Sequence, residues 1–170
     1  IRAWESRSNV RLVQRQEKPD LTASILAGTA TAKSDVIVVM DADLSHPPER
    51  LSAVVTPVLD GTHDVVVGSR YIAGGNTENW PLHRQLLSRI GGWIARPICD
   101  VNDATSGFFA FRRELTASIS NHAHGYKILL ELLMANQGKL RVTEVPIIFH
   151  DRTHGTSKLS FSHQRAYIQR

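Results

Sequence analysis

Apolar residues follow two alternating patterns along the chain: short runs rich in valine and isoleucine, and longer stretches with an apolar residue every three or four positions. Short runs of this kind are typical of buried strands, and the longer stretches are typical of amphipathic helices. The predicted strands are residues 10–15, 35–40, 64–70 and 107–111, with further extended chain at 140–150. The predicted helices are residues 20–32, 47–61, 81–99 and 126–137.

Residues that start or end helices mark several of these boundaries. Asp20 is a candidate N-cap, Pro47 and Pro48 suit the first turn of a helix, and Gly138 follows the last predicted helix. Strands that alternate with helices predict an α/β fold with a mainly parallel sheet covered by helices on both faces. Ligands of such sheets bind beyond the carboxyl ends of the strands.

The composition is that of one soluble domain, with no apolar run long enough to span a bilayer. Cys99 is the single cysteine and no signal-peptide pattern is visible, which predicts a reducing, cytoplasmic setting. The formal charge of +4 suits nucleic acid, an anionic membrane surface or a phosphorylated small molecule, and does not choose among them. Because the chain begins at Ile1 without a methionine, we expect an N-terminal piece to be missing.

Two aspartates follow the predicted strand 35–40 in the stretch V-I-V-V-M-D-A-D-L-S-H-P-P-E. Residues i and i+2 of an extended chain point to the same side, so Asp41 and Asp43 are expected to face one ion. Carboxylates at a sheet edge suit Mg²⁺ or Mn²⁺, which bind substrate phosphates in their remaining positions. The alternatives are a solvated turn that caps the next helix, and a phosphatase whose first aspartate is the nucleophile. Such phosphatases usually continue with Gly-Thr, whereas Leu44 and Ser45 follow here.

A second group of residues suits a phosphate. Arg70 follows a predicted strand, and Arg84 and Ser88 lie four residues apart on one face of the predicted helix 81–99. Two guanidinium groups and a hydroxyl could together bind a phosphate. The alternative is that these residues form a solvated face of the helix. An apolar stripe lies beside them: Leu82, Leu86, Ile90 and Trp93. A phosphate carried on a long hydrocarbon needs both a cationic pocket and an apolar neighbour.

The eight histidines include five that raise the question of a transition-metal site. They fall in different loops and lack the acidic companion of a metalloprotease motif, so we interpret them as surface or loop residues. These five are His46, His122, His124, His150 and His154.

Five spaced motifs carry a family resemblance. In chain order they are D-A-D-L-S-H-P-P, G-S-R-Y, E-N-W-P-L-x-R-x-x-x-S-R, D-A-T-S-G-F-F-A-F and D-R-x-x-G-x-S-K. Together they resemble the polyprenol-phosphate mannose synthases (dolichyl-phosphate mannosyltransferases) of glycosyltransferase family 2, over residues 10–161. The resemblance implies a GT-A fold, with residues 1–170 as one catalytic domain, and inversion at the sugar carbon. It also implies Mg²⁺ or Mn²⁺ as cofactor, GDP-mannose as donor and a polyprenyl monophosphate as acceptor.

The resemblance assigns roles to individual residues. Asp41, Asp43 and Ser45 fall on the family's metal positions, with serine the weakest ligand. The donor-contacting positions are Asp41, Ala42, Asp43, Lys127, Arg152 and Lys158. The acceptor-phosphate positions are Arg70, Arg84 and Ser88. Asp103 falls where an acidic residue approaches the sugar, so it joins Asp43 as a catalytic candidate, although a turn cap would explain it as well.

The implied setting is the cytoplasmic face of a membrane, to which the domain binds peripherally, with any membrane-spanning segments outside this chain. No nucleic acid partner is expected. The pairing of G-S-R-Y with D-R-x-x-G-x-S-K favours mannose over a related polyprenyl-phosphate glucosyltransferase or another sugar transferase. An aspartyl-nucleophile phosphatase and a non-catalytic phosphate-binding module are the alternatives from other functional classes.

Overall fold

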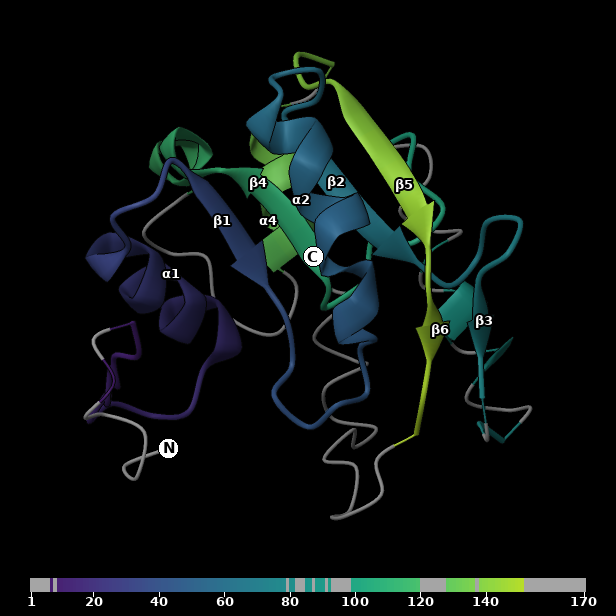
Figure 1. Cartoon of the computed structure of the whole chain (residues 1–170), viewed down its shortest axis with the longest axis horizontal. Coiled ribbons are helices and arrows are strands. Elements are labelled where there is room, and N and C mark those ends of the chain that lie inside the picture. Colours follow the sequence, from purple (N-terminus) through teal and green to yellow (C-terminus); the bar gives the residue numbers. More distant parts are fainter. Residues whose placement is uncertain are drawn as a thin grey trace.

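The centre of the molecule is a four-stranded sheet (Figure 1). The structure is a computed structural model that describes residues 7, 9–78, 80, 81, 85, 86, 88–90, 92, 99–119, 128–136 and 138–151. In spatial order the strands are β1 (Val36–Val39), β4 (Phe109–Arg112), β2 (Val65–Ser69) and β5 (Val142–Pro146). A second sheet pairs β3 (Asn76–Thr77) with β6 (Ile148–Phe149).

The sheet is mixed, because one strand runs against the others. β1, β2 and β5 share a direction, as the prediction of a mainly parallel sheet requires, and β2 pairs with β5 in parallel. β4 lies between β1 and β2 and is antiparallel to both. The alternation of strands and helices does not reveal this reversal, because the direction of a strand depends on the partners it pairs with. β4 therefore presents its amino end where its neighbours present their carboxyl ends.

Helices cover both faces of the sheet. The helical segments are α1 (Leu21–Thr31), η2 (Pro48–Arg50), α2 (Leu51–Leu59), η3 (Arg113–Ser118) and α4 (Ile128–Ala135). The predicted N-cap is confirmed, since the Asp20 carboxylate accepts a hydrogen bond of 2.8 Å from the backbone N–H of Ala23. Within the predicted helix 81–99, the described residues 85, 86, 88–90 and 92 are helical. None of the helices in the described part of the chain is both long and apolar enough to cross a bilayer.

One predicted strand was wrong, and one stretch correctly predicted as extended is divided into two strands. Residues 10–15 form no strand with any described part of the chain, and a strand needs a partner for its backbone hydrogen bonds. The stretch 140–150 is two strands that join different sheets, β5 and β6. Ile147 lies between them and donates its backbone N–H to the carbonyl of Ser69 at 2.9 Å. This break carries the chain from the main sheet to the small one.

The core has two halves because alternate strand residues face opposite sides of the sheet. On one side, Val66 packs with Val54 of α2. On the other, Val67 and Phe109 pack with Leu132 of α4. In Figure 1, α2 lies in front of the sheet and α4 behind it. Both faces are therefore buried, which explains the nearly continuous apolar runs of the strands.

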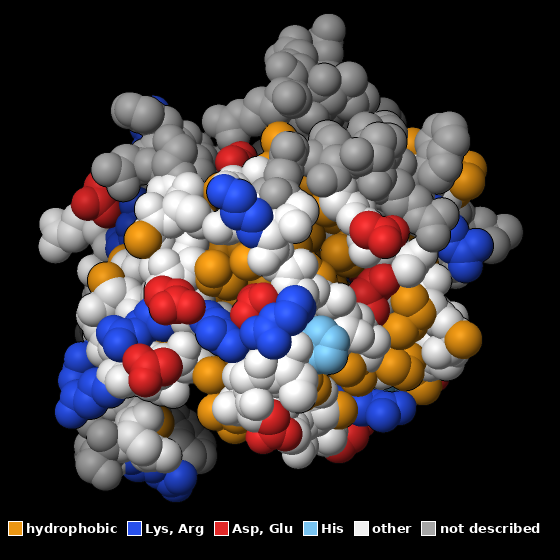
Figure 2. All heavy atoms as spheres, turned by 90° about the horizontal axis from the view of Figure 1, so that it is seen from above, with side chains coloured by type: hydrophobic (Ala, Val, Ile, Leu, Met, Phe, Trp, Pro, Cys, Tyr) orange, Lys and Arg blue, Asp and Glu red, His pale blue; other side chains and the backbone are white. Residues whose placement is uncertain are grey.

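An ionic cluster joins the strands at the other end of the sheet, at the top of Figure 1. Asp64, just before β2, accepts hydrogen bonds from the Arg141 side chain at 2.8 and 3.1 Å and lies 3.2 Å from Nε of Arg112. Figure 2 views this end and shows basic and acidic side chains next to one another. Hydrogen bonds from the Arg141 side chain are the main reason that the pKa of Asp64 is lowered to about 2. The cluster thus ties β2, β4 and β5 together.

We expect Asp64 to shape the acid stability of the protein. Because its pKa in the folded state lies below that of an unfolded chain, the carboxylate stabilises the fold above about pH 4. This contribution is lost as the pH falls from about 4 towards 2. Asp64→Asn should lower the melting temperature at neutral pH and flatten its decline over that acidic window. Thermal unfolding followed by circular dichroism tests this, and an equal decline in variant and wild type would contradict it.

Candidate active site

The carboxyl ends of β1, β2 and β5 meet the amino end of β4 at one edge of the sheet (Figure 1). Val39 lies opposite Phe109, and the backbone N–H of Gly68 donates to the carbonyl of Phe108 at 2.8 Å. The reversed direction of β4 therefore brings the segment before it, 103–108, to this edge. The segments that gather here are residues 41–46, 69–71, 103–108 and 147–151.

The D-A-D motif forms a turn directly after β1. The chain turns at residues 42–43 instead of staying extended, so the orientation of its two carboxylates is set by the turn and not by strand geometry. Leu44 completes the turn with a φ of 63°, a left-handed conformation that leucine rarely adopts. Asp43 Oδ1 accepts hydrogen bonds from the backbone N–H of Ser45, at 3.1 Å, and from the Ser45 hydroxyl. Asp41 keeps 41% of its side chain exposed.

His46, which we interpreted as a surface or loop residue, lies in a loop but is buried behind this turn, so it is not a surface residue. Only 2% of the residue is exposed, and its Nδ1 accepts a hydrogen bond of 3.2 Å from the backbone N–H of Asp41. Burial is the main cause that lowers the pKa of His46, although the nearby Asp41 carboxylate acts in the opposite direction. The sequence indicated a loop for this histidine, and its aromatic neighbours are Phe108, just before β4, and Phe149 of β6.

Arg70 and Asp103 form a buried ion pair. Arg70 Nε donates to Asp103 Oδ2 and Nη2 donates to Oδ1, each at 2.7 Å, and the Arg70 backbone N–H adds a third bond at 3.0 Å. Asp103 is 0% exposed. Burial opposes the charge of Arg70, but the attraction and hydrogen bonds of Asp103 outweigh it and raise the pKa of Arg70. Two charges removed from water in this way stabilise each other only while both are present.

Aromatic rings surround the guanidinium of Arg70. Its Cζ lies 5.1 Å from the ring centre of Tyr71, 5.4 Å from that of Trp80 and 5.7 Å from that of Phe149. Rings at these distances attract a cation and exclude water from it. The Tyr71 hydroxyl is also buried and has no hydrogen-bond partner in the described part of the chain.

Glu144 of β5 fixes the start of the segment that carries Asp103. Its Oε2 accepts from the backbone N–H of Asn102 at 2.9 Å and from the Asn102 side chain at 2.6 Å. Its Oε1 accepts from the backbone N–H of Asp103 at 3.0 Å. Further along, the Ser106 hydroxyl donates to the carbonyl of Gly68 at 2.6 Å. The segment is therefore tied to both β5 and β2.

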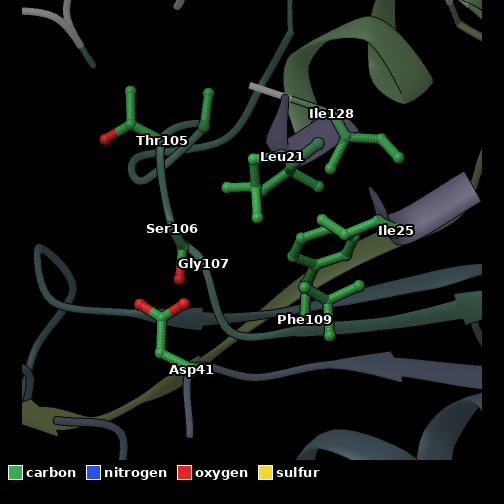
Figure 3. Close-up of a pocket in the computed structure, with 11 residues that line it drawn as sticks. Leu21, Ile25, Asp41, Thr105, Ser106, Gly107, Phe109 and Ile128 are labelled. Carbon is green, nitrogen blue, oxygen red and sulfur yellow. The ribbon is translucent and has the colours of Figure 1, made fainter. Parts of the chain in front are cut away.

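A pocket opens beside this segment (Figure 3). Asp41, Thr105, Ser106 and Gly107 form its polar side, and the Asp41 carboxylate lies next to Ser106 and Gly107 in the close-up. Its apolar side is lined by Leu21, Ile25, Val39, Ala104, Phe109, Ile128 and Leu129. A carboxylate of the D-A-D turn therefore borders a pocket with one polar and one apolar wall.

The side chains of the turn fit a weakly chelated divalent metal. Within the described residues, no group of three or more His, Cys, Asp or Glu side chains could hold a metal ion. Asp41 and Asp43 supply hard carboxylate oxygens, and Mg²⁺ and Mn²⁺ sites commonly combine one or two carboxylates with waters and substrate phosphates. The Ser45 hydroxyl is buried and bonded to Asp43 in this structure, so it supports that carboxylate.

The other predicted site residues divide into two sets. Ala42 is exposed on the turn, and Ser88 is half-buried on its helix. The remaining predicted residues lie outside the described residues: Arg84, Lys127, Arg152 and Lys158. Two residues that the sequence analysis did not single out, Glu144 and Phe149, prove central to this edge. Their only sequence signal was their place in the extended stretch before D-R-T-H-G.

We expect Asp103→Asn to destabilise the fold by about 3 kcal/mol, because it leaves the Arg70 charge buried without its counter-charge. The matched control is Asp35→Asn, since Asp35 pairs with Arg113 at 2.9 Å but is 96% exposed. Such a surface pair contributes less than about 1 kcal/mol. Urea denaturation of both variants measures the difference. Equal losses would contradict the importance of the buried pair.

Curated relatives cover most of this chain. It is 41% identical over 169 residues to the dolichol-phosphate mannosyltransferase of Pyrococcus furiosus, covering 93% of this chain and 47% of that protein. It is 34% identical to the dolichol-phosphate mannosyltransferase of Saccharomyces cerevisiae, covering 95% of this chain and 62% of that protein. It is 37% identical to the polyprenol monophosphomannose synthase of Mycolicibacterium smegmatis, covering 92% of this chain and 62% of that protein. The chain thus spans about half to three fifths of these relatives' lengths.

Solved structures agree on the fold. Glucosyl-3-phosphoglycerate synthase of Mycobacterium tuberculosis, in complex with phosphoglyceric acid, is similar with a TM-score of 0.62 at 21% identity, covering 90% of this chain and 52% of that one. The same enzyme with Mn²⁺ and uridine-diphosphate-glucose gives a TM-score of 0.61, with the same coverage. Residues 1–119 match the family described as Glycosyl transferase family 2. The chain therefore belongs to glycosyl transferase family 2 and has the GT-A fold.

Proposed function

We propose that this chain is the catalytic domain of an inverting glycosyltransferase that moves mannose from GDP-mannose to a polyprenyl monophosphate. The observation that carries the proposal is the D-A-D turn at the carboxyl end of β1, with Asp41 bordering the pocket beside residues 105–107. The relatives at 34–41% identity, which are named dolichol-phosphate and polyprenol mannosyltransferases, support mannose and a lipid phosphate as substrates.

Asp41 and Asp43 would hold Mg²⁺ or Mn²⁺ against the donor diphosphate. A bound divalent ion supplies positive charge that stabilises the leaving diphosphate. The metal role of Ser45 would be indirect, since its hydroxyl bonds to Asp43. Lys127, Arg152 and Lys158 would add positive charge around the donor, in keeping with their places in the family motifs.

The transfer itself breaks the bond between mannose C1 and the diphosphate oxygen and forms a bond between C1 and an acceptor phosphate oxygen. The acceptor phosphate is ionised near neutral pH, so no strongly basic side chain is required to activate it. Arg70, Arg84 and Ser88 would hold this phosphate close to the donor. Asp103 accepts hydrogen bonds from Nε and Nη2 of Arg70, so Arg70 would use Nη1 to bind the acceptor phosphate. Asp103 itself would act on the substrates through Arg70.

The acceptor also sets the proposed location. A polyprenyl chain is held in a bilayer, so the enzyme must work at a membrane surface, and the formal charge of +4 favours an anionic one. We place the domain peripherally at the cytoplasmic face, where a nucleotide sugar is available.

The decisive experiment is incubation of the full chain with several radiolabelled nucleotide sugars, Mn²⁺ and a polyprenyl phosphate, followed by extraction of the lipid. We expect label in the lipid from GDP-mannose, with Asp41→Asn and Asp43→Asn reduced at least about a hundredfold because the diphosphate loses its metal. Label from UDP-glucose instead would point to the glucosyltransferase alternative. Full turnover in both variants would refute the role of the turn.

The two proposed phosphate sites can be separated kinetically. Arg84→Ala should mainly raise the apparent KM for polyprenyl phosphate, and Lys158→Ala should mainly impair the use of GDP-mannose. Because each variant loses a charge-assisted hydrogen bond, the apparent KM for polyprenyl phosphate in the first variant and the efficiency with GDP-mannose in the second should each change by about ten- to a hundredfold. Arg84→Lys serves as the matched variant and should recover only part of the loss, because an ammonium cannot reproduce the guanidinium fork. Loss of affinity for the same substrate in both variants would contradict two separate sites.

A further inference from the structure

The backbone of the D-A-D turn is held from behind by a side chain that the proposed chemistry does not use. His46 Nδ1 accepts the backbone N–H of Asp41 at 3.2 Å, and the same nitrogen lies 3.9 Å from Asp41 Oδ2. The acceptor role leaves the ring proton on Nε2. The Nδ1 lone pair is therefore engaged by the backbone, and His46 does not present it to a cation.

The imidazole ring has little room to move. It lies 5.2 Å from the ring centre of Phe149, edge to face, and 5.5 Å from that of Phe108. A side chain at Gly107 would bring its Cβ within 3.3 Å of His46 Cε1. Phe149 of β6 and two residues of the 103–108 segment, Gly107 and Phe108, thus fix the plane of the ring. A fixed ring holds its acceptor nitrogen at a defined place.

The turn needs such a support because its own backbone is strained. Leu44 is in the left-handed region, at a φ of 63°, and the residue is 74% exposed, so packing of its side chain does not stabilise the conformation. Two hydrogen bonds between the turn and neighbouring residues can be named in the described part of the chain. One joins Asp41 to His46, and the other runs from the backbone N–H of His150 to the carbonyl of Ser45 at 3.0 Å.

We propose that His46 is a positioning residue for Asp41: by holding the Asp41 backbone it fixes the carboxylate for a divalent cation. This inference rests on the proposed function, because it presumes that the turn binds the metal. Partners that orient metal ligands typically change metal affinity by about ten- to a hundredfold when removed. The role concerns hydrogen bonding, and it is separable from the packing of the ring.

Two substitutions separate the hydrogen bond from the packing. His46→Phe keeps an aromatic ring between its neighbours but removes the acceptor. His46→Asn gives up the ring but places Oδ1 near the position of Nδ1. Phe108→Leu is the packing control, since it loosens the ring's surroundings and leaves the acceptor in place.

The measurement is the affinity of the full chain for Mn²⁺ alone, followed by the loss of the free-ion signal in electron paramagnetic resonance, with melting temperatures in parallel. We expect His46→Phe to weaken Mn²⁺ binding by about tenfold or more. The His46→Asn and Phe108→Leu variants should have lower melting temperatures than the wild type. Their affinity for Mn²⁺ should nevertheless stay within about threefold of the wild-type value, in contrast to the tenfold loss expected for His46→Phe. Wild-type affinity in His46→Phe, or an equal loss in His46→Asn, would overturn the proposal.

A measurement on the wild-type protein covers the case in which a variant does not fold. The ¹⁵N spectrum of His46 at neutral pH should show an unprotonated Nδ1 and a protonated Nε2, and a proton on Nδ1 would overturn the proposal. A wild-type chain that binds no Mn²⁺ would refute the metal site of the proposed function, whereas failure of the variants alone would refute only the role of His46.

Discussion

The buried pair of Arg70 and Asp103 joins two segments that lie far apart in the sequence, the end of β2 and the loop before β4. The remaining geometry of this edge depends on that contact. Asp103 accepts from the backbone as well as the side chain of Arg70, so the pair fixes main chain and not only two side chains. Glu144 then attaches the same loop to β5. Three strands are thereby held together where their polar residues converge.

A buried ion pair must be well hydrogen-bonded to be tolerated, and this one is. Both Asp103 oxygens are engaged by Arg70, and Thr105 accepts a further hydrogen bond from Nη2 at 3.1 Å. The rings around the guanidinium contribute attraction on its open faces. Phe149 also contacts His46, so one ring touches both the support of the D-A-D turn and the arginine proposed for the acceptor. Phe149 therefore links the loop behind the D-A-D turn to the guanidinium of Arg70.

Local sequence signals predicted the parts of this fold that local physics decides. The Asp20 cap, the strands near 36–39 and 65–69, and the place of Asp41 after a strand follow from nearby residues. The direction of β4, the burial of His46 and the partnership of Arg70 with Asp103 depend on chain segments that meet only after folding. A single sequence contains no signal for such pairings. The motifs that contain Asp41, Arg70 and Asp103 lie at one end of the sheet in the structure, but the motifs themselves did not reveal the contacts among these residues.

The strand order has a consequence for how the chain folds. In the main sheet no strand is hydrogen-bonded to the strand that precedes or follows it among the described elements, since β1 pairs with β4, β4 with β2, and β2 with β5. Each pairing closes a long loop. Closing a loop lowers the conformational entropy of the chain before the contacts of the sheet can compensate for this loss. There is no hairpin in this sheet to nucleate it. Folding of the sheet should consequently be slow, and the polar edge can form only after segments that are far apart in the sequence have paired.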